Sequence, residues 1–392
     1  MQNNLSPIIL FVYNRPEHTL KTLQALEKND LASESNIFIY VDGLKLNSSN
    51  DDKLKNEQVF EVVSRAWKFN SIRIKKREKN VGLAENIIGG VTEILKEFEK
   101  IIVLEDDIVT SKGFLTYMNS SLNKYAHNEK VMHVSGYMYP VGINLPQTFF
   151  IGVPLCWGWA TWRTSWNKLI TDTEFLFREV DERNLWAKIN KFGEDRLGIQ
   201  LKLNKTGQLK TWFIKWHISV FLNDGLSLFP YKSLVQNIGF DSSGVNNPTT
   251  KSFKHKELAL NINIEDIDVS ENKLALEAIQ KFYFDHDDRI SRKRNKQLIK
   301  ISFPIKIIAK CLRRFINRIQ HHNLNSPINE IRLENNLYLG KSTKLNTPYK
   351  VSNVYVGSYT YISENSNISE TEIGKFCSIG PNILCGYGIH PT

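Results

Sequence analysis

The segment KIIVLEDDIVT, residues 100–110, decides how the rest of the chain is interpreted. Its apolar residues 101–104 form a short continuous run, which is typical of a fully buried central strand. They are followed directly by Glu105, Asp106 and Asp107. Because unpaired charge is costly inside a core, we expect these carboxylates at the carboxyl edge of a sheet, where open α/β sheets bind ligands. Adjacent acids there suit a divalent cation that substrate phosphates also hold, and the alternative is a solvated acidic turn.

The residues before this segment alternate between short apolar runs and stretches with helical spacing. The expected strands are residues 8–13, 37–41 and 71–75, and the expected helices are residues 16–28, 57–69 and 83–98. Strands that alternate with helices form parallel pairs. The pattern therefore predicts an α/β fold in which helices flank both faces of a mostly parallel sheet.

Two more of the expected strands end in polar residues, Asn14-Arg15 and Asp42-Gly43. The carboxyl ends of parallel strands meet at one edge of a sheet, so these residues and the acidic triplet together favour a nucleotide site there. The first strand is not followed by the GxGxxG pattern, which argues against a dinucleotide-binding fold. GKST at residues 340–343 lacks the earlier glycine of a phosphate-binding loop.

The composition is that of a soluble globular protein, with 392 residues of which 41% are hydrophobic and 23% are charged. The four cysteines show no metal-ligand spacing, which indicates structural thiols in a reducing compartment. The N-terminal residues lack the basic start of a signal peptide, and no apolar run approaches the roughly 20 residues of a membrane span. These features predict a cytoplasmic protein.

The net charge of +10 is concentrated in one stretch. Residues 291–320 contain ten lysines and arginines and no acid, so the rest of the chain is neutral. This local placement argues against nucleic acid as a partner of the whole protein. Residues 305–320 have the spacing of a basic amphipathic helix, which predicts peripheral contact with the inner face of the cytoplasmic membrane through residues 292–318. The alternative is a linker helix packed on a neighbouring domain.

Tryptophans crowd the segment CWGWATW, residues 156–162. Aromatic planes beside a cleft can stack on sugar rings or bases, since they combine apolar area with a polar edge. Trp157, Trp159 and Trp162 are therefore candidates for stacking on the acceptor or on a sugar. The alternative is that all three belong to the core.

Two loops between the later elements carry polar groups that could face a cleft. Gly-Glu-Asp at residues 193–195 lies between two amphipathic stretches and could present a carboxylate. The glycine-rich segment NIGFDSSG, residues 237–244, could be a mobile lid, or it could be a plain surface loop.

Six motifs follow one another in a familiar order: YNRP, VDG, NVGLAENIIGGV, VLEDDI, WGWATW and QNIGFDSSG. In this order they resemble the nucleotide-sugar glycosyltransferases of the GT-A fold, in particular the bacterial relatives of N-acetylglucosaminyltransferase I. The resemblance covers residues 5–250, and its most specific parts are EDD, WGWATW and NIGFD. It predicts a Rossmann-like GT-A glycosyltransferase domain over residues 1–250.

The resemblance implies that a nucleotide-sugar donor, most simply a UDP-sugar, is held at the carboxyl edge of the sheet. Arg15 would contact the nucleotide diphosphate, and Asp42 would contact the uracil. Glu105 and Asp106 would lie near the ribose and the sugar. The donor-binding residues that the resemblance implies are Asn14, Arg15, Asp42, Asn86, Glu105 and Asp106.

The resemblance also implies a metal ion and a catalytic base. Asp107 would ligate Mn²⁺ or Mg²⁺, which would bridge the diphosphate. The aspartate base of the animal enzymes stands beside a tryptophan, near where this chain has Lys215 or Thr211. The ED pair that ends at Asp195 resembles the pair that supplies the base in many other GT-A enzymes. We therefore expect Asp195 to be the base, with Asp241 as the second choice.

The reaction that these roles imply is metal-assisted transfer of a sugar, with inversion, to a hydroxyl of a glycan or of a lipid-linked oligosaccharide. Its setting would be the synthesis of bacterial surface polysaccharide. One alternative is a sugar O-acetyltransferase of the hexapeptide class, or a bifunctional protein of which this chain is a part. Another alternative is a scaffold that has kept the fold without catalysis.

The last part of the chain repeats with a period of six residues, as in EIGKFC and SIGPNI. This rhythm is typical of a left-handed parallel β-helix, and it resembles the hexapeptide acetyltransferases, whose histidine matches His390. We expect a short, truncated β-helix over residues 331–392, after a helical linker over residues 251–330. Such a stack could join copies into a homotrimer, and we expect it to lack acetyltransferase activity because too few coils follow His390.

Overall fold

A computed structural model of the chain divides it into two compact units, Met1–Ile290 and Ser291–Thr392. The structure describes residues 5–192, 196–241, 252–283 and 285 of the first unit. In the second unit it describes residues 330–333, 337–340, 343–346, 349–357, 359–374, 377–382 and 384–385. The expected basic helix over residues 305–320 and the expected acetyltransferase-like His390 lie outside the described residues. Among the described helices, none is long and apolar enough to cross a membrane.

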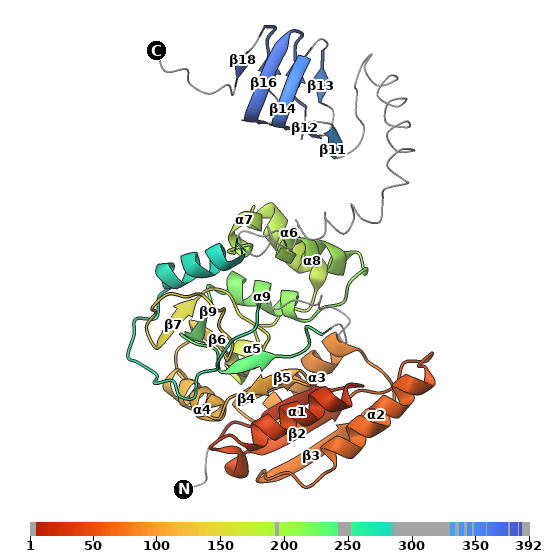
Figure 1. The fold of residues 1–392 in the computed structure, drawn as a ribbon, viewed down its shortest axis with the longest axis vertical. Helices are drawn as coiled ribbons and strands as arrows, with labels where there is room; N and C mark the ends of the chain where they lie inside the picture. Colours follow the sequence, from red (N-terminus) through yellow and green to blue (C-terminus); the bar gives the residue numbers. More distant parts are fainter. Residues whose placement is uncertain are drawn as a thin grey trace. The chain divides into compact units, whose positions relative to one another are not determined.

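The first unit is built on an eight-stranded mixed sheet with the order β3-β2-β1-β4-β8-β6-β9-β7 (Figure 1). Strands β3, β2, β1 and β4 pair in parallel, β6 pairs in parallel with β9, and β8 and β7 run in the opposite direction. The strands are β1 (Ile8–Val12), β2 (Asn36–Val41), β3 (Ser71–Lys76), β4 (Lys100–Glu105), β6 (Val131–Ser135), β7 (Thr148–Ile151), β8 (Trp159–Trp162) and β9 (Leu226–Pro230). The expected α/β sheet is thus confirmed.

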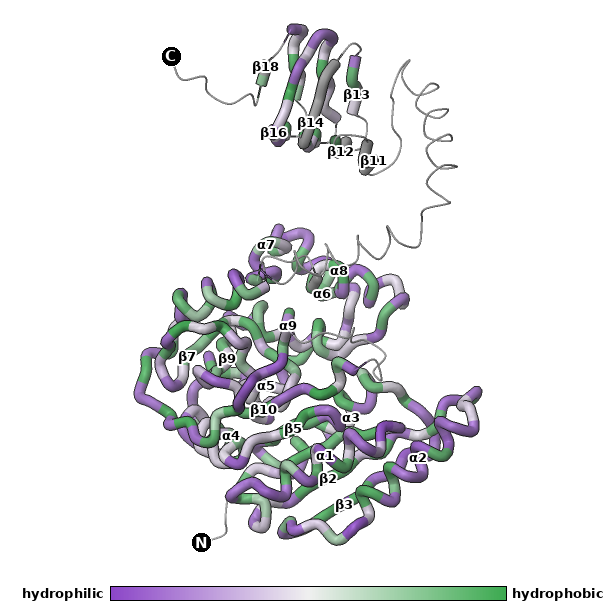
Figure 2. Tube along the Cα trace, in the orientation of Figure 1, coloured by the Kyte–Doolittle hydropathy of each residue, from purple (hydrophilic) through white to green (hydrophobic). Residues whose placement is uncertain are grey.

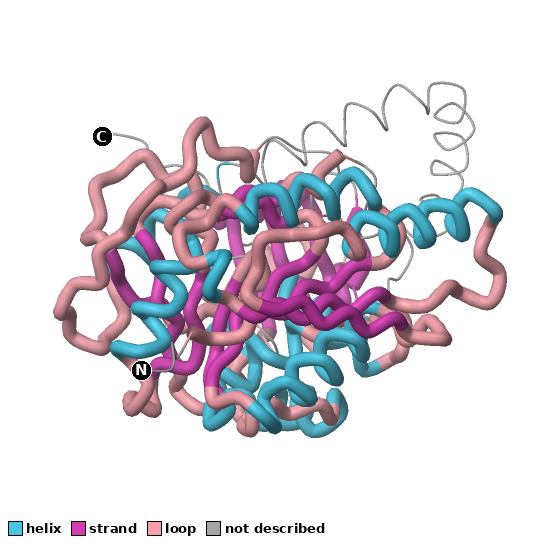
Figure 3. The backbone as a smooth tube through the Cα atoms, turned by 90° about the horizontal axis from the view of Figure 1, so that it is seen from below, coloured by secondary structure: helices cyan, strands magenta, loops and turns pink. Residues whose placement is uncertain are grey.

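Helices cover both faces of this sheet, as Figure 3 shows. One face packs against α1, α2 and α4, and the other packs against α3, α5 and α9. Helices α6, α7 and α8 form a smaller apolar cluster with α9. The helices are α1 (Pro16–Glu27), α2 (Asn50–Val63), α3 (Leu83–Glu97), α4 (Phe114–Lys124), α5 (Arg163–Trp166), α6 (Thr173–Glu182), α7 (Trp186–Ile189), α8 (Arg196–Lys205) and α9 (Phe213–Leu222), with a 3₁₀ turn η1 (Ala32–Glu34).

The strands divide their side chains between the two faces with a period of two. In β1, Ile8 and Leu10 belong to the core on the side of α1, whereas Ile9 and Phe11 belong to the core on the side of α3. A strand that is buried on both faces has no polar positions, which explains its continuous apolar run. The expected strands and the helices α1 and α3 are confirmed to within two residues.

Helix α2 differs from the expectation that a helix spans residues 57–69. It begins at Asn50, because Ser49 accepts a hydrogen bond from the backbone of Asp52 while Asp52 accepts one from the backbone of Ser49. This capping box starts the helix in a polar stretch without an apolar signal. Figure 2 shows hydrophilic and hydrophobic residues alternating along this surface helix.

The first unit continues beyond residue 250, where we had expected the glycosyltransferase domain to end and a linker to begin. Residues 252–283 contribute buried side chains to the core on the side of α1, and they include Phe253, Ala259 and Ile279. These apolar residues are too widely spaced to stand out in a polar sequence. Their burial makes the segment part of the first unit.

The described part of the second unit contains two sheets, with the orders β11-β12-β14-β16-β18 and β13-β15-β17. Apart from the antiparallel pair β11–β12, neighbouring strands are parallel, and each partner lies 17 residues further along the chain. A small apolar core that includes Val354 and Ile362 lies within the unit. The strands are β11 (Glu330–Leu333), β12 (Leu337–Gly340), β13 (Lys344–Leu345), β14 (Tyr349–Val356), β15 (Tyr361–Ile362), β16 (Ser366–Ile373), β17 (Ser378–Ile379) and β18 (Leu384–Cys385). These sheets do not by themselves establish a left-handed β-helix, which stays a prediction.

Candidate functional site

The polar residues that follow β1, β2 and β4 meet at one edge of the sheet. Strand β1 lies between β2 and β4, with Val12 opposite Val41 and Phe11 opposite Glu105. The parallel pairing therefore brings Arg15, Asp42 and the acidic triplet to the same carboxyl edge, as the sequence predicts.

Arg15 is held by two carboxylates of the triplet. Its guanidinium forms a two-point contact with Asp106, through Nη2 and Oδ1 and through Nε and Oδ2 at 3.3 Å. Its Nη1 lies 3.0 Å from Asp107 Oδ2. Burial of Arg15 alone would lower its pKa, but the charges of the two aspartates outweigh this effect and raise the pKa above its usual range. Arg15 is therefore a permanent cation at the centre of the site.

The acidic triplet carries more negative charge than Arg15 neutralises. Burial, followed by the charges of Asp107 and Asp106, raises the pKa of Glu105 to about 8. Burial also raises the pKa of Asp106 to about 6, although Arg15 acts in the opposite direction. Three carboxyl groups thus share one guanidinium. An additional cation at this edge would relieve the repulsion among the carboxylates.

A short antiparallel ribbon leads the chain back over the triplet. Strand β5 (Ile108–Thr110) starts directly after Asp107 and pairs with β10 (Val235–Asn237), so that Ile108 lies opposite Asn237. The backbone N–H of Ile238 donates to the carbonyl oxygen of Asp107 at 2.9 Å. The pairing brings together the EDD and NIGFD motifs, which lie far apart in the sequence.

Gly239 lies directly against the two charged groups at the centre of the site. A Cβ atom at this position would overlap Asp107 Oδ2 and would lie 3.1 Å from Arg15 Nη1. The Gly239 N–H donates to Asn237 Oδ1 at 2.7 Å, which keeps the loop close to the acids. Only glycine fits here without displacing Asp107 or Arg15, so this loop covers the metal-ligand candidate.

The second candidate for the catalytic base lies at the end of this loop. Asp241 Oδ2 is 3.0 Å from His18 Nε2 on α1, and its side chain is 48% exposed. His18 stands one helical turn after Arg15, so the His18–Asp241 pair lies close to Arg15. Asp195, which the resemblance favours as the base, lies outside the described residues. The sequence offered no separate signal for His18.

Asp42 differs from the acidic triplet in that its carboxylate already accepts four hydrogen bonds. The donors are the backbone N–H groups of Gly43, Val81 and Gly82 and the side-chain amide of Asn80, at distances of 2.9 to 3.1 Å. These bonds tie the turn after β2 to the loop that precedes α3. A uracil would have to compete with them, so the predicted contact of Asp42 with the base remains a prediction.

The two asparagines that the resemblance implies in donor binding also have protein partners. Asn14 Nδ2 donates to Asp52 Oδ1 at 2.8 Å, at the first turn of α2. Asn86, which is buried in α3, accepts a bond of 2.6 Å from Arg77 Nε. Arg77 follows β3, so it lies at the carboxyl edge of the sheet, and it was not among the site residues predicted from the sequence.

Two of the three tryptophans expected to stack on a ligand are part of the core. Trp159 is 0% exposed and stacks on His133 and Trp212, with ring centroids 5.4 and 5.1 Å apart. Trp162 is 4% exposed, and its Nε1 donates to the carbonyl oxygen of Leu122. Rings enclosed in this way cannot contact a sugar. For these two residues the alternative interpretation, core packing, is correct.

The third tryptophan, Trp157, is only partly buried and lies next to the loop over Asp107. Its ring meets that of Phe240 edge to face, with centroids 5.4 Å apart, and also contacts Tyr137. The neighbouring Cys156 was not predicted as a site residue. Burial raises the pKa of the Cys156 thiol, and the charges of Glu105 and Asp107 raise it further. The thiol therefore stays protonated beside the acids.

Within the described part of the chain, no group of three or more histidine, cysteine or acidic side chains is arranged to hold a metal ion by itself. A metal at Asp107 would thus depend on oxygen atoms from a substrate or from water. Mg²⁺ typically binds in this way, with one or two carboxylates and the phosphates of a substrate. Asp107 fits that requirement, since it lies at the carboxyl edge and shares a single guanidinium with Asp106.

No family model and no curated protein sequence matches this chain. Among solved structures, S. aureus TarS 1–349 is similar with a TM-score of 0.33 and 13% identity, over 58% of this chain and 59% of that one. A longer S. aureus TarS structure gives the same TM-score and identity, with 36% of that chain covered. A cytidylyltransferase from Leptospira borgpetersenii serovar Hardjo-bovis (strain JB197) has a TM-score of 0.26 and 10% identity, over 42% of this chain and 63% of that chain. Likenesses this distant carry no functional argument, which must come from the site.

Proposed function

We propose that the first unit is a metal-dependent glycosyltransferase that moves a sugar from a nucleotide-sugar donor to a hydroxyl of a glycan or of a lipid-linked oligosaccharide. The observation that carries this proposal is the unbalanced acidic triplet at the carboxyl edge, paired with Arg15 and covered by Gly239. A site with one partly buried guanidinium and surplus carboxylates is suited to a diphosphate that arrives together with a divalent cation.

In this proposal Asp107 would hold Mn²⁺ or Mg²⁺, Glu105 and Asp106 would lie near the ribose and the sugar, and Arg15 would contact the diphosphate of the donor. When bound, the metal neutralises charge that develops on the leaving diphosphate. Arg15 is well placed for its role, because Asp106 and Asp107 fix its guanidinium before a substrate arrives. A cation positioned in advance stabilises charge in the transition state without reorganising.

The transfer itself exchanges one bond at the anomeric carbon of the sugar. The acceptor oxygen forms a bond to that carbon while the bond from the carbon to the diphosphate oxygen breaks, and its electron pair leaves with the nucleoside diphosphate. The proton of the attacking hydroxyl passes to a carboxylate, Asp195 or Asp241. Attack on the face opposite the leaving group inverts the anomeric centre.

The choice between the two bases rests on different kinds of support. Asp195 is favoured by the resemblance of the ED pair. Asp241 is favoured by its partly exposed carboxylate and by its contact with His18 beside Arg15. Substitution of each aspartate by asparagine, with turnover and donor affinity measured separately, distinguishes them.

The direct test is to incubate the full chain with a panel of UDP-, GDP- and CMP-sugars, with and without Mn²⁺, and to measure release of the nucleotide. Metal-dependent hydrolysis or transfer with one donor is the expected result. Asp107→Asn should abolish metal-dependent donor binding in calorimetry. Asp51→Asn, which removes an exposed carboxylate from α2, is the matched control and should bind like the parent chain. Donor affinity that is the same in the parent and in Asp107→Asn would reject the metal assignment.

Several expectations about the rest of the chain also remain proposals. They are contact with an anionic membrane surface through residues 292–318, a homotrimer formed through the second unit, and the alternative O-acetyltransferase activity. All three involve residues outside the described ranges, His390 among them. Acetyl-CoA turnover by the full chain, lost in His390→Ala, would favour the alternative activity.

A further inference from the structure

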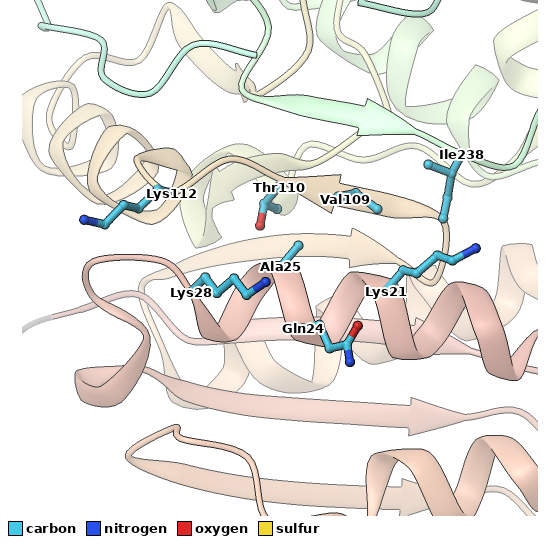
Figure 4. Close-up of a pocket in the computed structure, with 8 residues that line it drawn as sticks. All are labelled: Lys21, Gln24, Ala25, Lys28, Val109, Thr110, Lys112 and Ile238. Atoms are coloured by element: carbon cyan, nitrogen blue, oxygen red, sulfur yellow. The ribbon is translucent and has the colours of Figure 1, made fainter. Parts of the chain in front are cut away.

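A groove with basic rims lies beside the site, between α1 and the ribbon of β5 and β10 (Figure 4). Its volume is about 570 Å³. The floor includes the apolar side chains of Ala25, Val109 and Ile238, and the rims carry Lys21, Lys28 and Lys112. The site described above does not use this groove.

The helical spacing of α1 lines up the groove's basic residues on one face. Lys21, Ala25 and Lys28 stand four and three residues apart, which places them in a row along the helix. With a rise of 1.5 Å per residue, the two lysines are separated by about 10 Å along the axis. Figure 4 shows Lys21 near Ile238 and Lys28 near Thr110, so the groove follows the helix for two turns.

The charge of the groove is positive and largely unpaired. Its lining includes three lysines and no acidic residue. Lys112 forms an ion pair with Asp30 at 3.1 Å, whereas Lys21 and Lys28 form no ion pair with a described residue. Both of these side chains are exposed at the rims. An anion that lies between them would meet two ammonium groups without a competing carboxylate.

One end of the groove adjoins the site. Ile238 lines the groove, and its backbone N–H is bonded to the carbonyl of Asp107. His18, the partner of Asp241, stands one helical turn before Lys21 on the same face of α1. A molecule that extends along the groove would therefore bring one end close to Asp107 and Asp241.

We propose that the groove binds the acceptor's carrier, and that this carrier is a phosphate-bearing amphiphile. Its phosphate lies between Lys21 and Lys28, its apolar chain covers Ala25 and Val109, and the glycan that the phosphate carries passes Ile238 toward Asp107. The donor's diphosphate does not fill this groove, since it belongs with Arg15 and Asp107. The assignment to an acceptor rests on the proposed function, whereas binding of the amphiphile can be measured without any transfer activity.

Isothermal calorimetry on the full chain tests the proposal, with dodecyl phosphate as the probe below its micellar concentration. The neutral amphiphile dodecyl maltoside and inorganic phosphate are the two reference ligands. Lys21→Gln/Lys28→Gln should weaken dodecyl phosphate binding about tenfold or more. The matched control is Lys53→Gln/Lys96→Gln, which removes the same charge from exposed positions on α2 and α3 and should leave binding unchanged. Ala25→Trp, which fills the floor, should also weaken binding.

Equal affinity of the parent and the Lys21/Lys28 variant for dodecyl phosphate would overturn the proposal. The proposal would also be overturned if dodecyl maltoside or inorganic phosphate bound as tightly as dodecyl phosphate. The first result would show that the phosphate group is not needed, and the second that the apolar chain is not needed. UDP with Mn²⁺, titrated into the same proteins, separates the two proposals. Lysine-dependent dodecyl phosphate binding without UDP binding supports the groove and rejects a UDP-dependent glycosyltransferase. Nucleotide binding without dodecyl phosphate binding rejects the groove alone.

Discussion

Asp42 and the acidic triplet of residues 105–107 occupy equivalent places in the fold but differ in the hydrogen-bond donors and charges that surround them. Both follow a parallel strand, and both lie at the carboxyl edge of the same sheet. Asp42 and Asp107 are buried to a similar extent, with 4% and 6% of their surfaces exposed. Asp42 accepts four hydrogen bonds from the loops around it. The triplet shares a single guanidinium among three carboxyl groups.

On the proposed function, this difference means that Asp42 stabilises the fold and that the triplet holds the ligand. A carboxylate whose lone pairs are satisfied by backbone N–H groups stabilises the loops that supply those groups. In the triplet, burial and the negative charge of Asp107 contribute to the raised pKa of both Glu105 and Asp106, and an incoming cation would relieve this repulsion. The position of an acid at a strand end is therefore not enough to assign its role, and its donors must be counted.

The largest effect on turnover is expected when an acid of the triplet, Asp107, is replaced. Asp107→Ala should lower turnover by about three orders of magnitude, because the carboxylate that we propose as the metal ligand is lost. The free energy of unfolding should change by about 1 kcal/mol or less, since Arg15 keeps its pair with Asp106 and the loss of Asp107 relieves its repulsion of Glu105. Steady-state kinetics and urea unfolding measure the two quantities. An equal loss of stability and activity would contradict the distinction.

The reverse pattern is expected when Asp42 is changed. Asp42→Ala leaves four donors without their acceptor and should lower the free energy of unfolding by about 3 kcal/mol. Turnover of the remaining folded protein should fall far less than in Asp107→Ala. Urea unfolding and kinetics at a temperature well below the melting transition check this. Wild-type stability together with lost donor binding would instead mean that Asp42 holds the base of the nucleotide.

The catalytic base differs from both Asp42 and Asp107, because its loss should change neither the stability of the fold nor the affinity for the donor. Asp195→Asn should lower kcat about 100-fold while donor affinity stays nearly unchanged, as expected for a group that acts on the acceptor. Asp241→Asn is the parallel variant, with the kinetic measurement and the donor titration repeated on it. If Asp241→Asn has this effect and Asp195→Asn does not, then Asp241 is the base.

The smallest effect concerns the pH dependence of stability without metal. The pKa of Glu105 is raised from its model-peptide value of 4.5 to about 8 in the folded state. Between these values the folded chain binds more protons than the unfolded chain, so the contribution of Glu105 to stability falls as pH rises. We therefore compare the free energy of unfolding of Glu105→Gln with that of the parent, both without metal. This difference should be more favourable to the variant at pH 8 than at pH 5, by about 1–2 kcal/mol.

The difference between parent and Glu105→Gln is needed because buried histidines act in the opposite direction. Burial lowers the pKa of His133 to about 3 and that of His217 to about 4, so both oppose folding as pH falls below 6.5. These contributions are the same in both proteins and cancel. Addition of Mn²⁺ should reduce the difference and release protons, which calorimetry in two buffers detects. If the free energy of unfolding depended on pH in the same way in both proteins, the pKa of Glu105 would not be raised by the neighbouring acids.

The sequence alone determined the alternation of strands and helices, because that signal is local. An apolar run such as residues 101–104 is typical of a strand buried on both faces, and charged residues directly after it are expected at the sheet's edge. Parallel pairing then follows from the intervening helices, and it predicts that Arg15, Asp42 and Asp107 share one edge. The structure confirms that placement.

Only the tertiary structure decided what those residues contact, because their partners come from distant parts of the chain. Three of the four donors to Asp42 come from residues 80–82, and the loop over Asp107 comes from residues 237–239. The burial of Trp159 likewise depends on Trp212, which no local pattern connects to it. Sequence periodicity records which side of an element faces the core. It does not record which other segment covers that side, and the role of a polar side chain depends on that segment.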